Sequence, residues 1–303
     1  MTTPSPFDIT ENYDVLRRRW LNRYVNNQNT VDVQIRKILN QGAEDAAVRI
    51  ALLDKNPTFS ARVRTAQIRM TMKEIKAVLN DVFKEVHPVI KEGQGKVAAS
   101  AVDAFAETDR KYLERVFSSV HDVNSFIEGQ KLSARVGIAH AISRVTKSQQ
   151  PLSTNVYKSQ ALATNWVHRT VTSSIMRGDS AQDIAKQVRS SIKPSTPGGA
   201  SYAALRLGRT ELNNAFHATA ITLAEDRPWV EGMAWNLSKV HEKSTGKMEI
   251  CEQLAGQIFT VDAVPPKPHP QCRCFVTPQL EPYETFVRHL TAGYYRDWID
   301  NAA

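Results

Sequence analysis

Apolar residues recur every three or four positions along most of the chain, which is the spacing of one face of an α-helix. The first such stripe consists of Tyr13, Leu16, Trp20 and Tyr24, and the arginine run at 17–19 projects away from it. A stripe of this kind packs into a core more often than it forms an interface, although its aromatic residues are also typical of interface hot spots. We therefore expect a buried helix face here and keep partner binding as the alternative.

Two longer helical stretches follow this stripe. Thr30 is a candidate N-cap for a helix that ends at Asn56-Pro57 and carries Val31, Ile35, Ile38 and Leu39. From residue 58 to about 150 nearly the whole sequence is compatible with helix, with a stripe of Val63, Ile68, Met72, Ile75, Leu79 and Phe83. We expect breaks at His87-Pro88 and at 93–95, where proline and glycine disfavour a continuous helix. Residues 1–150 thus predict an extended helical bundle.

The pattern changes after a polar break at 147–151, where we place a domain boundary. Helices are predicted at about 155–176, at 180–192 after a stop and cap at 178–180, and at 201–225, with a loop at 193–200. Met233, Trp235 and Leu237 alternate as in a strand, and 257–261 is a second candidate strand. The predicted fold class is therefore mainly α, with a small α+β domain near the C-terminus.

A last helix is predicted at 282–299. Its expected packing face consists of Phe286, Leu290, Tyr294 and Trp298.

Basic residues are poorly balanced by acids in the middle of the chain. The 303 residues carry a formal net charge of +8 at pH 7, but residues 151–210 contain only two acids, Asp179 and Asp183. Such a segment can lie against nucleic acid or an acidic protein surface, whereas charges at helical spacing also occur on any solvated helix face. If it contacts DNA through phosphates, the candidate residues are Lys158, Arg169, Arg177, Lys186, Arg189 and Lys193.

Several function classes are disfavoured by motifs that the sequence lacks. No run of 18 or more apolar residues occurs, and the first residues do not have the pattern of a signal peptide. There is also no P-loop, no GxGxxG and no His-Glu-x-x-His motif. We therefore expect no membrane contact and no catalytic site. Without a signal peptide, the protein is expected to stay in the compartment where it is made or to leave it by a route that needs no such peptide.

All three cysteines, Cys251, Cys272 and Cys274, lie near the C-terminus. Their odd number argues against a closed set of disulfides, and a bridge between Cys272 and Cys274 would close a strained ring. With His269 they offer four ligands for a structural zinc ion, which would staple the proline-rich segment PPKPHPQCRC at 265–274. The alternative is three small buried thiols beside a histidine that caps a turn. A thiol nucleophile is disfavoured, because a base on the same segment is poorly placed to activate it.

Several of these motifs occur in an order that resembles a known family. Arg209-Thr210-Glu211 is followed by Trp235, by the stretch from Cys251 to Gly256 with Phe259 after it, and by His269-Pro270-x-Cys272-Arg273-Cys274. From about Trp166 to Pro278 the chain resembles the phage Mu protein F-like family, also called phage head morphogenesis or minor head proteins. The resemblance does not extend to residues 1–150.

One position departs from the family pattern, which has a pair of cysteines before the glycine. Cys251 falls on the second cysteine of that pair, and Met248 stands at the first. A thioether is a poor zinc ligand. If relatives bind zinc through four cysteines, this chain either recruits His269 or has lost the metal and kept the fold.

The resemblance also implies a role. It implies a structural minor head protein at the portal vertex in the capsid interior, present in the host cytoplasm during assembly, that assists head morphogenesis and genome packaging or ejection. The expected partners are the portal protein, the major capsid or scaffold protein, and packaged DNA bound without sequence specificity. We divide the chain into a portal- or capsid-interacting region at 1–150, the Mu F-like domain at 151–281 and a C-terminal helix at 282–303. The alternative is a zinc-stabilised, non-specific DNA-binding protein.

Arg209 and Glu211 have a catalytic and a structural interpretation. ADP-ribosyltransferases also use an arginine and a glutamate, but this chain has no Ser-Thr-Ser strand and no Glu-x-Glu turn. Residues two apart on a helix point in different directions, so each needs its own partner, and we expect one or both to bond to residues 272–274. Arg209, Glu211, Trp235 and Gly256 are therefore assigned structural roles.

Overall fold

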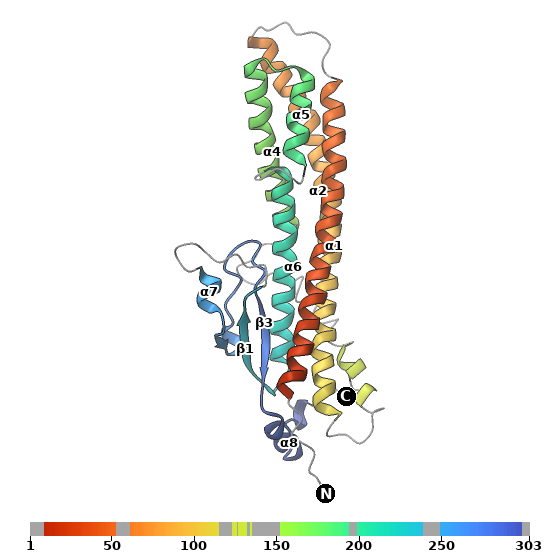
Figure 1. Cartoon of the computed structure of the whole chain (residues 1–303). Coiled ribbons are helices and arrows are strands. Elements are labelled where there is room, and N and C mark those ends of the chain that lie inside the picture. Colours follow the sequence, from red (N-terminus) through yellow and green to blue (C-terminus); the bar gives the residue numbers. More distant parts are fainter. Residues whose placement is uncertain are drawn as a thin grey trace. The chain divides into compact units, whose positions relative to one another are not determined.

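The computed structural model describes residues 9–52, 61–114, 123–125, 127–131, 134, 152–193, 199–238 and 249–298. The helices are α1 (Ile9–Ala51), α2 (Ala61–Leu113), α4 (Leu152–Arg177), α5 (Ala181–Ile192), α6 (Ala200–Glu225), α7 (Ile250–Leu254) and α8 (Tyr283–Thr291), with a 3-10 turn η1 (Val261–Ala263). The strands are β1 (Val230–Asn236), β2 (Ile258–Phe259) and β3 (Phe275–Leu280) (Figure 1). The predicted fold class, mainly α with a small α+β region near the C-terminus, is confirmed.

The chain forms two compact units, each assembled from separate segments. Unit 1 contains Met1–Asn27, Gln94–Thr146 and Leu212–Ala303, and unit 2 contains Gln28–Gly93 and Lys147–Glu211. The borders fall inside α1, α2 and α6, so the units are not successive stretches of sequence. The functional division at 150 and 281 stays a prediction, and its first border lies outside the described residues.

α1 is one continuous helix, so the helix start predicted at Thr30 is wrong. Thr30 is exposed, and neither glycine nor proline lies near it. The buried stripe continues past it with unchanged spacing, through Trp20, Tyr24, Gln28, Val31, Ile35 and Leu39. A good capping residue does not stop a helix whose apolar face continues on both sides. The burial of Trp20 and Tyr24 confirms the core interpretation for both, whereas the side chain of Tyr13 lies outside the described residues.

α2 runs through Pro88 and through residues 93–95, so the breaks predicted there are also wrong. Pro88 is exposed, whereas Val86 and Ile90 on either side of it are fully buried. Proline costs about 3 kcal/mol inside an isolated helix, but a continuous buried face on the opposite side offsets this cost. In the predicted stripe Met72, Ile75, Leu79 and Phe83 are buried and Ile68 is partly buried, whereas the side chain of Val63 is not described.

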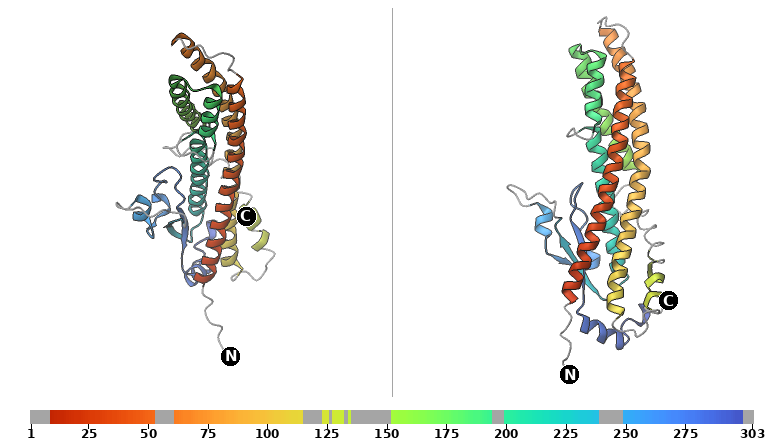
Figure 2. Two further views of the ribbon diagram at one scale, coloured as in Figure 1. Left: turned by 45° about the horizontal axis from the view of Figure 1, so that its top comes forward. Right: turned by 45° about the vertical axis from the view of Figure 1, so that its right-hand side comes forward.

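In unit 2, α4 and α5 lie side by side as a helical hairpin (Figure 2). Gly178 adopts the left-handed backbone conformation that ends α4, with φ of +84°. The hydroxyl of Ser180 then accepts a hydrogen bond from the backbone N–H of Asp183 at 3.1 Å, which caps α5. The stop and cap predicted at 178–180 are therefore confirmed.

The sheet of unit 1 has the strand order β2-β1-β3, and both pairs are antiparallel. Met233 and Trp235 are buried as their alternation predicts, whereas Leu237 lies beyond the end of β1 and is exposed. The sequence pattern does not indicate β3, because Pro278 lies inside it and proline disfavours a strand. β3 tolerates this proline because it is an edge strand.

The helix predicted at 282–299 is shorter in the structure, because α8 ends at Thr291. Gly293 follows in the left-handed conformation, with φ of +80°, and shifts the register of the next residues. Tyr294 is consequently 74% exposed, which corrects its assignment to the packing face, and Tyr295 is buried instead. Phe286 is fully buried, and Trp298 packs edge-on against Trp229 with ring centroids 4.4 Å apart.

Candidate metal centre

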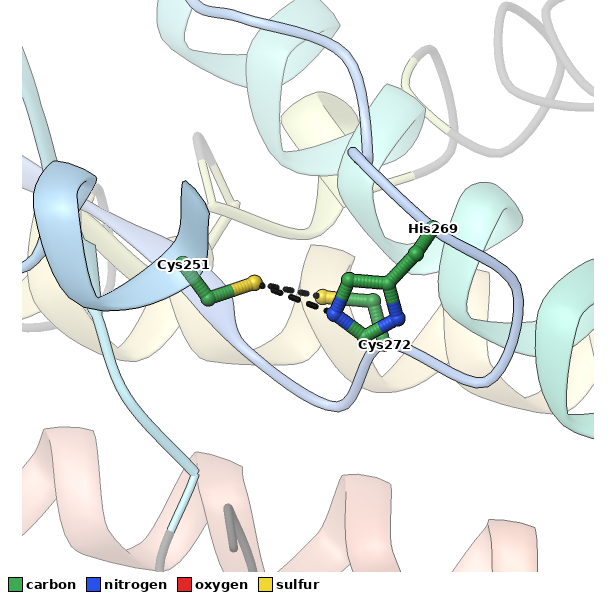
Figure 3. Close-up of side chains that lie close together, drawn as sticks. All are labelled: Cys251, His269 and Cys272. Atoms are coloured by element: carbon green, nitrogen blue, oxygen red, sulfur yellow. Dashed lines mark hydrogen bonds between the residues drawn. The ribbon is translucent and has the colours of Figure 1, made fainter. Parts of the chain in front are cut away.

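Three of the four predicted ligands converge at one point of unit 1. Cys251 lies on α7, whereas His269 and Cys272 lie on residues 265–274, which we call the strap and which lead into β3. The Sγ atom of Cys251 is 3.4 Å from Nε2 of His269 and 3.5 Å from Sγ of Cys272. Figure 3 shows the three side chains pointing toward one another. The cluster therefore joins a short helix to the strap.

A tight turn places His269 beside Cys272. The backbone N–H of Cys272 donates to the carbonyl of His269 at 3.3 Å, and Gln271 between them has φ of +62°. Proline at the second position and a left-handed residue at the third are features of a type II turn. A residue other than glycine costs about 1–2 kcal/mol in this conformation. The chain accepts this strain at the point where it brings two ligand atoms together.

The hydrogen bonds of His269 fix the proton on its ring. Nδ1 lies 3.0 Å from the carbonyl oxygen of Pro270, which can only accept, so Nδ1 carries the hydrogen and donates it. In the neutral ring Nε2 is then left with a free lone pair that faces the thiols. Metal-binding histidines typically have such a second-nitrogen bond to a backbone carbonyl. His269 thus presents the tautomer that a metal ion requires.

The spacing of the ligand atoms fits zinc. In a tetrahedron with Zn–S of about 2.3 Å and Zn–N of about 2.05 Å, two sulfurs lie about 3.8 Å apart and a sulfur and a nitrogen about 3.6 Å apart. The corresponding distances in the cluster are 3.5 Å and 3.4 Å. Thiolate and imidazole are also the donors that zinc prefers in structural sites. The three residues therefore fit a zinc ion in both geometry and chemistry.

Cys274 lies beside this cluster. Its thiol hydrogen-bonds that of Cys272, which raises the pKa of Cys274 together with burial and lowers the pKa of Cys272. Burial raises the pKa of Cys251 to about 11. Three thiols this close together do not all ionise unless a cation compensates their charges. Met248, the residue at the family's other cysteine position, lies outside the described residues.

Two polar residues of α6, which sequence reasoning missed, hold the strap. The side-chain amide of Asn213 donates to the carbonyl of Cys272 and accepts from the hydroxyl of Tyr24 at 2.7 Å. One turn later, Nε2 of His217 donates to the carbonyl of Pro265 at 3.1 Å. Burial lowers the pKa of His217 to about 3, so its ring is neutral. The sequence signal that could have identified Asn213 and His217 is a pair of polar residues at i and i+4 on an otherwise apolar helix face.

Lys267 provides a positive charge inside the strap. Its ammonium group donates to the carbonyl of Cys274 and lies 4.9 Å from the ring centroid of Trp235, which is itself buried. Burial lowers the pKa of Lys267 to about 8. A cation over an indole ring is an attractive contact. The buried ring of Trp235 therefore provides an aromatic surface for Lys267 of the strap.

Gly256 closes the segment after α7. Its φ is +78°, a conformation that favours glycine, and its N–H donates to the carbonyl of Trp235 at 2.9 Å. This bond ties the end of α7, and with it Cys251, to β1.

Arg209 and Glu211 bind to separate helices of unit 2. The guanidinium of Arg209 donates to Asp32 on α1 at 2.6 and 2.9 Å. Glu211 accepts from Asn155 on α4 at 2.8 Å, and burial raises its pKa. The strap contacts described above come from Asn213 and His217, which lie further along the same helix. The structural roles of Arg209 and Glu211, which these contacts favour, remain predictions.

The six candidate DNA-binding residues are all at least partly exposed, but most have acidic neighbours. Arg177 pairs with Asp179 at 2.7 Å and Lys186 with Asp183 at 3.5 Å. Arg189 and Lys193 both pair with Glu44 on α1. Lys158 and Arg169 on α4 have no ion pair with a described residue. Much of the positive charge of this region is therefore compensated within the protein.

The fold and the cluster define a mainly helical protein whose small α+β part contains a cluster of two cysteines and a histidine. Residues 165–277 match the family model described as Phage Mu protein F like protein, and this segment belongs to the phage Mu protein F-like family. No curated protein and no solved structure matches the chain. The matched segment contains the whole cluster, together with Arg209, Trp235 and Gly256.

The family match supports a coarse statement of function. It supports a bacteriophage protein of head morphogenesis, that is, a structural head protein of the virion. Among the described residues, no helix has both the length and the apolar character that a membrane span requires.

Proposed function

We propose that the protein is a minor head protein that binds the portal protein at the portal vertex inside the head and assists head assembly. The family match over residues 165–277 is the observation that carries this proposal. The portal contact is assigned to exposed residues of the region 1–150, because Trp20 and Tyr24 are used in the core. Large exposed apolar residues remain there on α1, after its end and on α2, at Val33, Val48, Leu52 and Met70.

In this proposal the cysteine and histidine cluster has an architectural role. Cys251, His269 through Nε2, and Cys272 would hold a zinc ion. Cys274, whose thiol hydrogen-bonds that of Cys272 but which is not part of the three-residue cluster, is the proposed fourth ligand. The ion would supply a crosslink between α7 and the strap, and a set of four protein ligands leaves no open position for a substrate. Asn213, His217 and Lys267 orient the strap so that the ligands meet.

Co-sedimentation of the full-length protein with portal rings of the same phage tests the proposal. Deleting residues 1–150 is not a suitable test, because this deletion removes parts of both compact units. Full-length variants Val48→Asp and Met70→Asp, which place a charge on the exposed faces of α1 and α2, are expected to weaken portal binding about tenfold or more. Ile258→Asp on β2, which is equally exposed, is the matched control. Failure of the unmodified protein to bind portal rings would overturn the proposed role.

The alternative, non-specific DNA binding, is favoured only by the basic residues of α4 and α5. Four of the six candidates already pair with carboxylates, which reduces the charge available to phosphates. If DNA binding is the main function, affinity for duplex DNA will fall steeply with salt and portal binding will be absent. These two measurements on the same full-length protein distinguish the two functions.

A further inference from the structure

The outer face of α4 carries large apolar side chains that remain exposed. The buried face of this helix contains Val156, Ala163, Val167, Val171, Ser174 and Ile175. On the opposite side, at steps of three and four, lie Lys158, Leu162, Trp166, Arg169, Ser173 and Met176, which we call the α4 stripe. Leu162 is 63% exposed, Trp166 41% and Met176 61%. α4 is therefore apolar on two opposite faces, of which only one is covered by its own unit.

The charges of the α4 stripe are all of one sign. α4 contains no aspartate or glutamate. Lys158 and Arg169 are exposed within the stripe and have no ion pair in the described part of the chain, in contrast to the paired basic residues from Arg177 onward. The surface thus combines exposed apolar side chains with uncompensated positive charge.

We propose that the α4 stripe is the docking site of an acidic amphipathic helix of another protein. Tryptophan, methionine and arginine are enriched in protein interfaces, and the stripe carries one of each. From Lys158 to Met176 it extends about 27 Å, at 1.5 Å per residue, which matches a partner helix of about five turns. The apolar face of the partner covers Leu162, Trp166 and Met176, and its carboxylates lie opposite Lys158 and Arg169.

Two other occupants fit the α4 stripe less well. A second copy that pairs through its own α4 would place cations near cations with no carboxylate on either helix, which is unfavourable. Duplex DNA would neutralise Lys158 and Arg169 but would leave the apolar side chains without a partner. Charge complementarity together with apolar cover selects the acidic helix.

This inference goes beyond the proposed function, because it concerns a different surface from the portal contact assigned to residues 1–150. The inference does not depend on which protein supplies the acidic helix. The α4 stripe can therefore fail to bind an acidic helix while portal binding succeeds, and the reverse outcome is equally possible.

Binding of designed peptides to the full-length protein tests the inference. The probes are a labelled amphipathic peptide of about three heptads with leucine at a and d and glutamate at e and g, the same peptide with lysine in place of glutamate, and a DNA duplex of about 20 base pairs. Fluorescence anisotropy is expected to show that the acidic peptide binds at least about tenfold more tightly than the lysine peptide, and less tightly as salt rises.

Variants locate the binding to the α4 stripe. Leu162→Ser and Arg169→Glu are each expected to weaken binding of the acidic peptide about tenfold or more. Tyr157→Ser is the matched control, because Tyr157 is 71% exposed on the same helix but lies outside the stripe, and it should leave binding unchanged. Circular dichroism checks that each variant keeps its helical content.

Several outcomes would overturn the inference. One is no binding of the acidic peptide, and another is equal binding of the lysine peptide. If the protein binds DNA but not the acidic peptide, and if Leu162→Ser and Arg169→Glu abolish this DNA binding, the stripe is a nucleic-acid-binding surface. Self-association that Leu162→Ser abolishes would instead make it a contact between copies of this chain.

Discussion

α2 and the strap show two different ways in which this chain becomes ordered. α2 is held by its own backbone hydrogen bonds and by apolar residues spread over its whole length, and it continues through an exposed proline. The strap depends on a few polar contacts, from Asn213, His217 and Lys267, and on the cluster around Cys251. Order that is spread over many residues tolerates local faults, whereas order that rests on a few contacts is lost when one of them is removed.

The largest effect is expected from removal of a ligand in the cluster. Cys251→Ser should eliminate bound zinc and lower the free energy of unfolding by at least about 3 kcal/mol, because binding of a structural metal contributes directly to folding. Elemental analysis should find one zinc per chain in the unmodified protein, and urea denaturation measures the change in stability. Ile258→Ser on the exposed strand β2 is the control. Unmodified protein that is purified without zinc and gains no stability from added zinc would contradict the metal assignment.

Asn213 offers the next test of how much a single contact of the strap contributes. Asn213→Ala removes the bond to the carbonyl of Cys272 and the bond from the hydroxyl of Tyr24, so a loss of about 2–3 kcal/mol in the free energy of unfolding is expected. Tyr24→Phe removes only the hydroxyl and should cost about 1 kcal/mol. Equal losses in the two variants would show that the bond to the strap contributes nothing.

His217 makes the anchoring of the strap sensitive to acid. Its pKa is about 3 in the folded protein and about 6.5 in the unfolded chain, so the unfolded state binds the proton first and stability is lost as pH falls below 6.5. Between pH 7 and pH 5 this amounts to about 2 kcal/mol. Urea denaturation at both pH values should show this loss in the unmodified protein and not in His217→Gln, which keeps a donor for Pro265. Zinc release at low pH affects both proteins, and the comparison cancels it.

Pro88 tests how well α2 tolerates an unfavourable residue. Pro88→Ala restores a backbone hydrogen bond and removes a steric clash, while it makes the unfolded chain more flexible. A net gain of about 1–2 kcal/mol in the free energy of unfolding is expected. Lys84→Ala, at an exposed position one turn earlier, should change stability by less than about 0.5 kcal/mol. A destabilised Pro88→Ala variant would mean that α2 requires the proline.

The smallest gain in stability is expected from Gln271→Gly, in the turn between His269 and Cys272. Gln271→Gly relieves the left-handed strain but adds freedom to the unfolded chain, so we expect a gain of about 0.5 kcal/mol. Gln271→Val should lower stability by more than about 1 kcal/mol, because a β-branched side chain fits this conformation poorly. Thermal denaturation of the two variants separates these effects, and equal behaviour would exclude a strained turn.

The sequence predicts some elements of this fold well because the local signals are strong. The stop at Gly178 and the cap at Ser180 act within one turn of helix, and the alternation of Met233 and Trp235 reports directly on a half-buried strand. The breaks expected at Thr30 and Pro88 fail because a capping residue or a proline is a weaker influence than a long continuous apolar face. β3 escapes prediction because its proline is tolerated only on an edge strand, and strand order is not a local property.

The candidate site is predictable in part for similar reasons. The chain has only three cysteines, so Cys251 and Cys272 stand out as ligands, and His269 stands out because it lies three positions before Cys272. Asn213 and His217 do not stand out, because their importance comes from the strap carbonyls that they meet, and those lie 48 or more positions away in sequence.

The discontinuous make-up of unit 1 also has a consequence for the growing chain on the ribosome. Tyr24 is made early, but its partner Asn213 follows 189 positions later. At typical rates of synthesis this delay lasts about 10–40 s. During that time the aromatic face of α1 lacks its native contacts with α6. We expect this face to be covered by a chaperone, or by a temporary contact between α1 and α2, until α6 emerges from the ribosome.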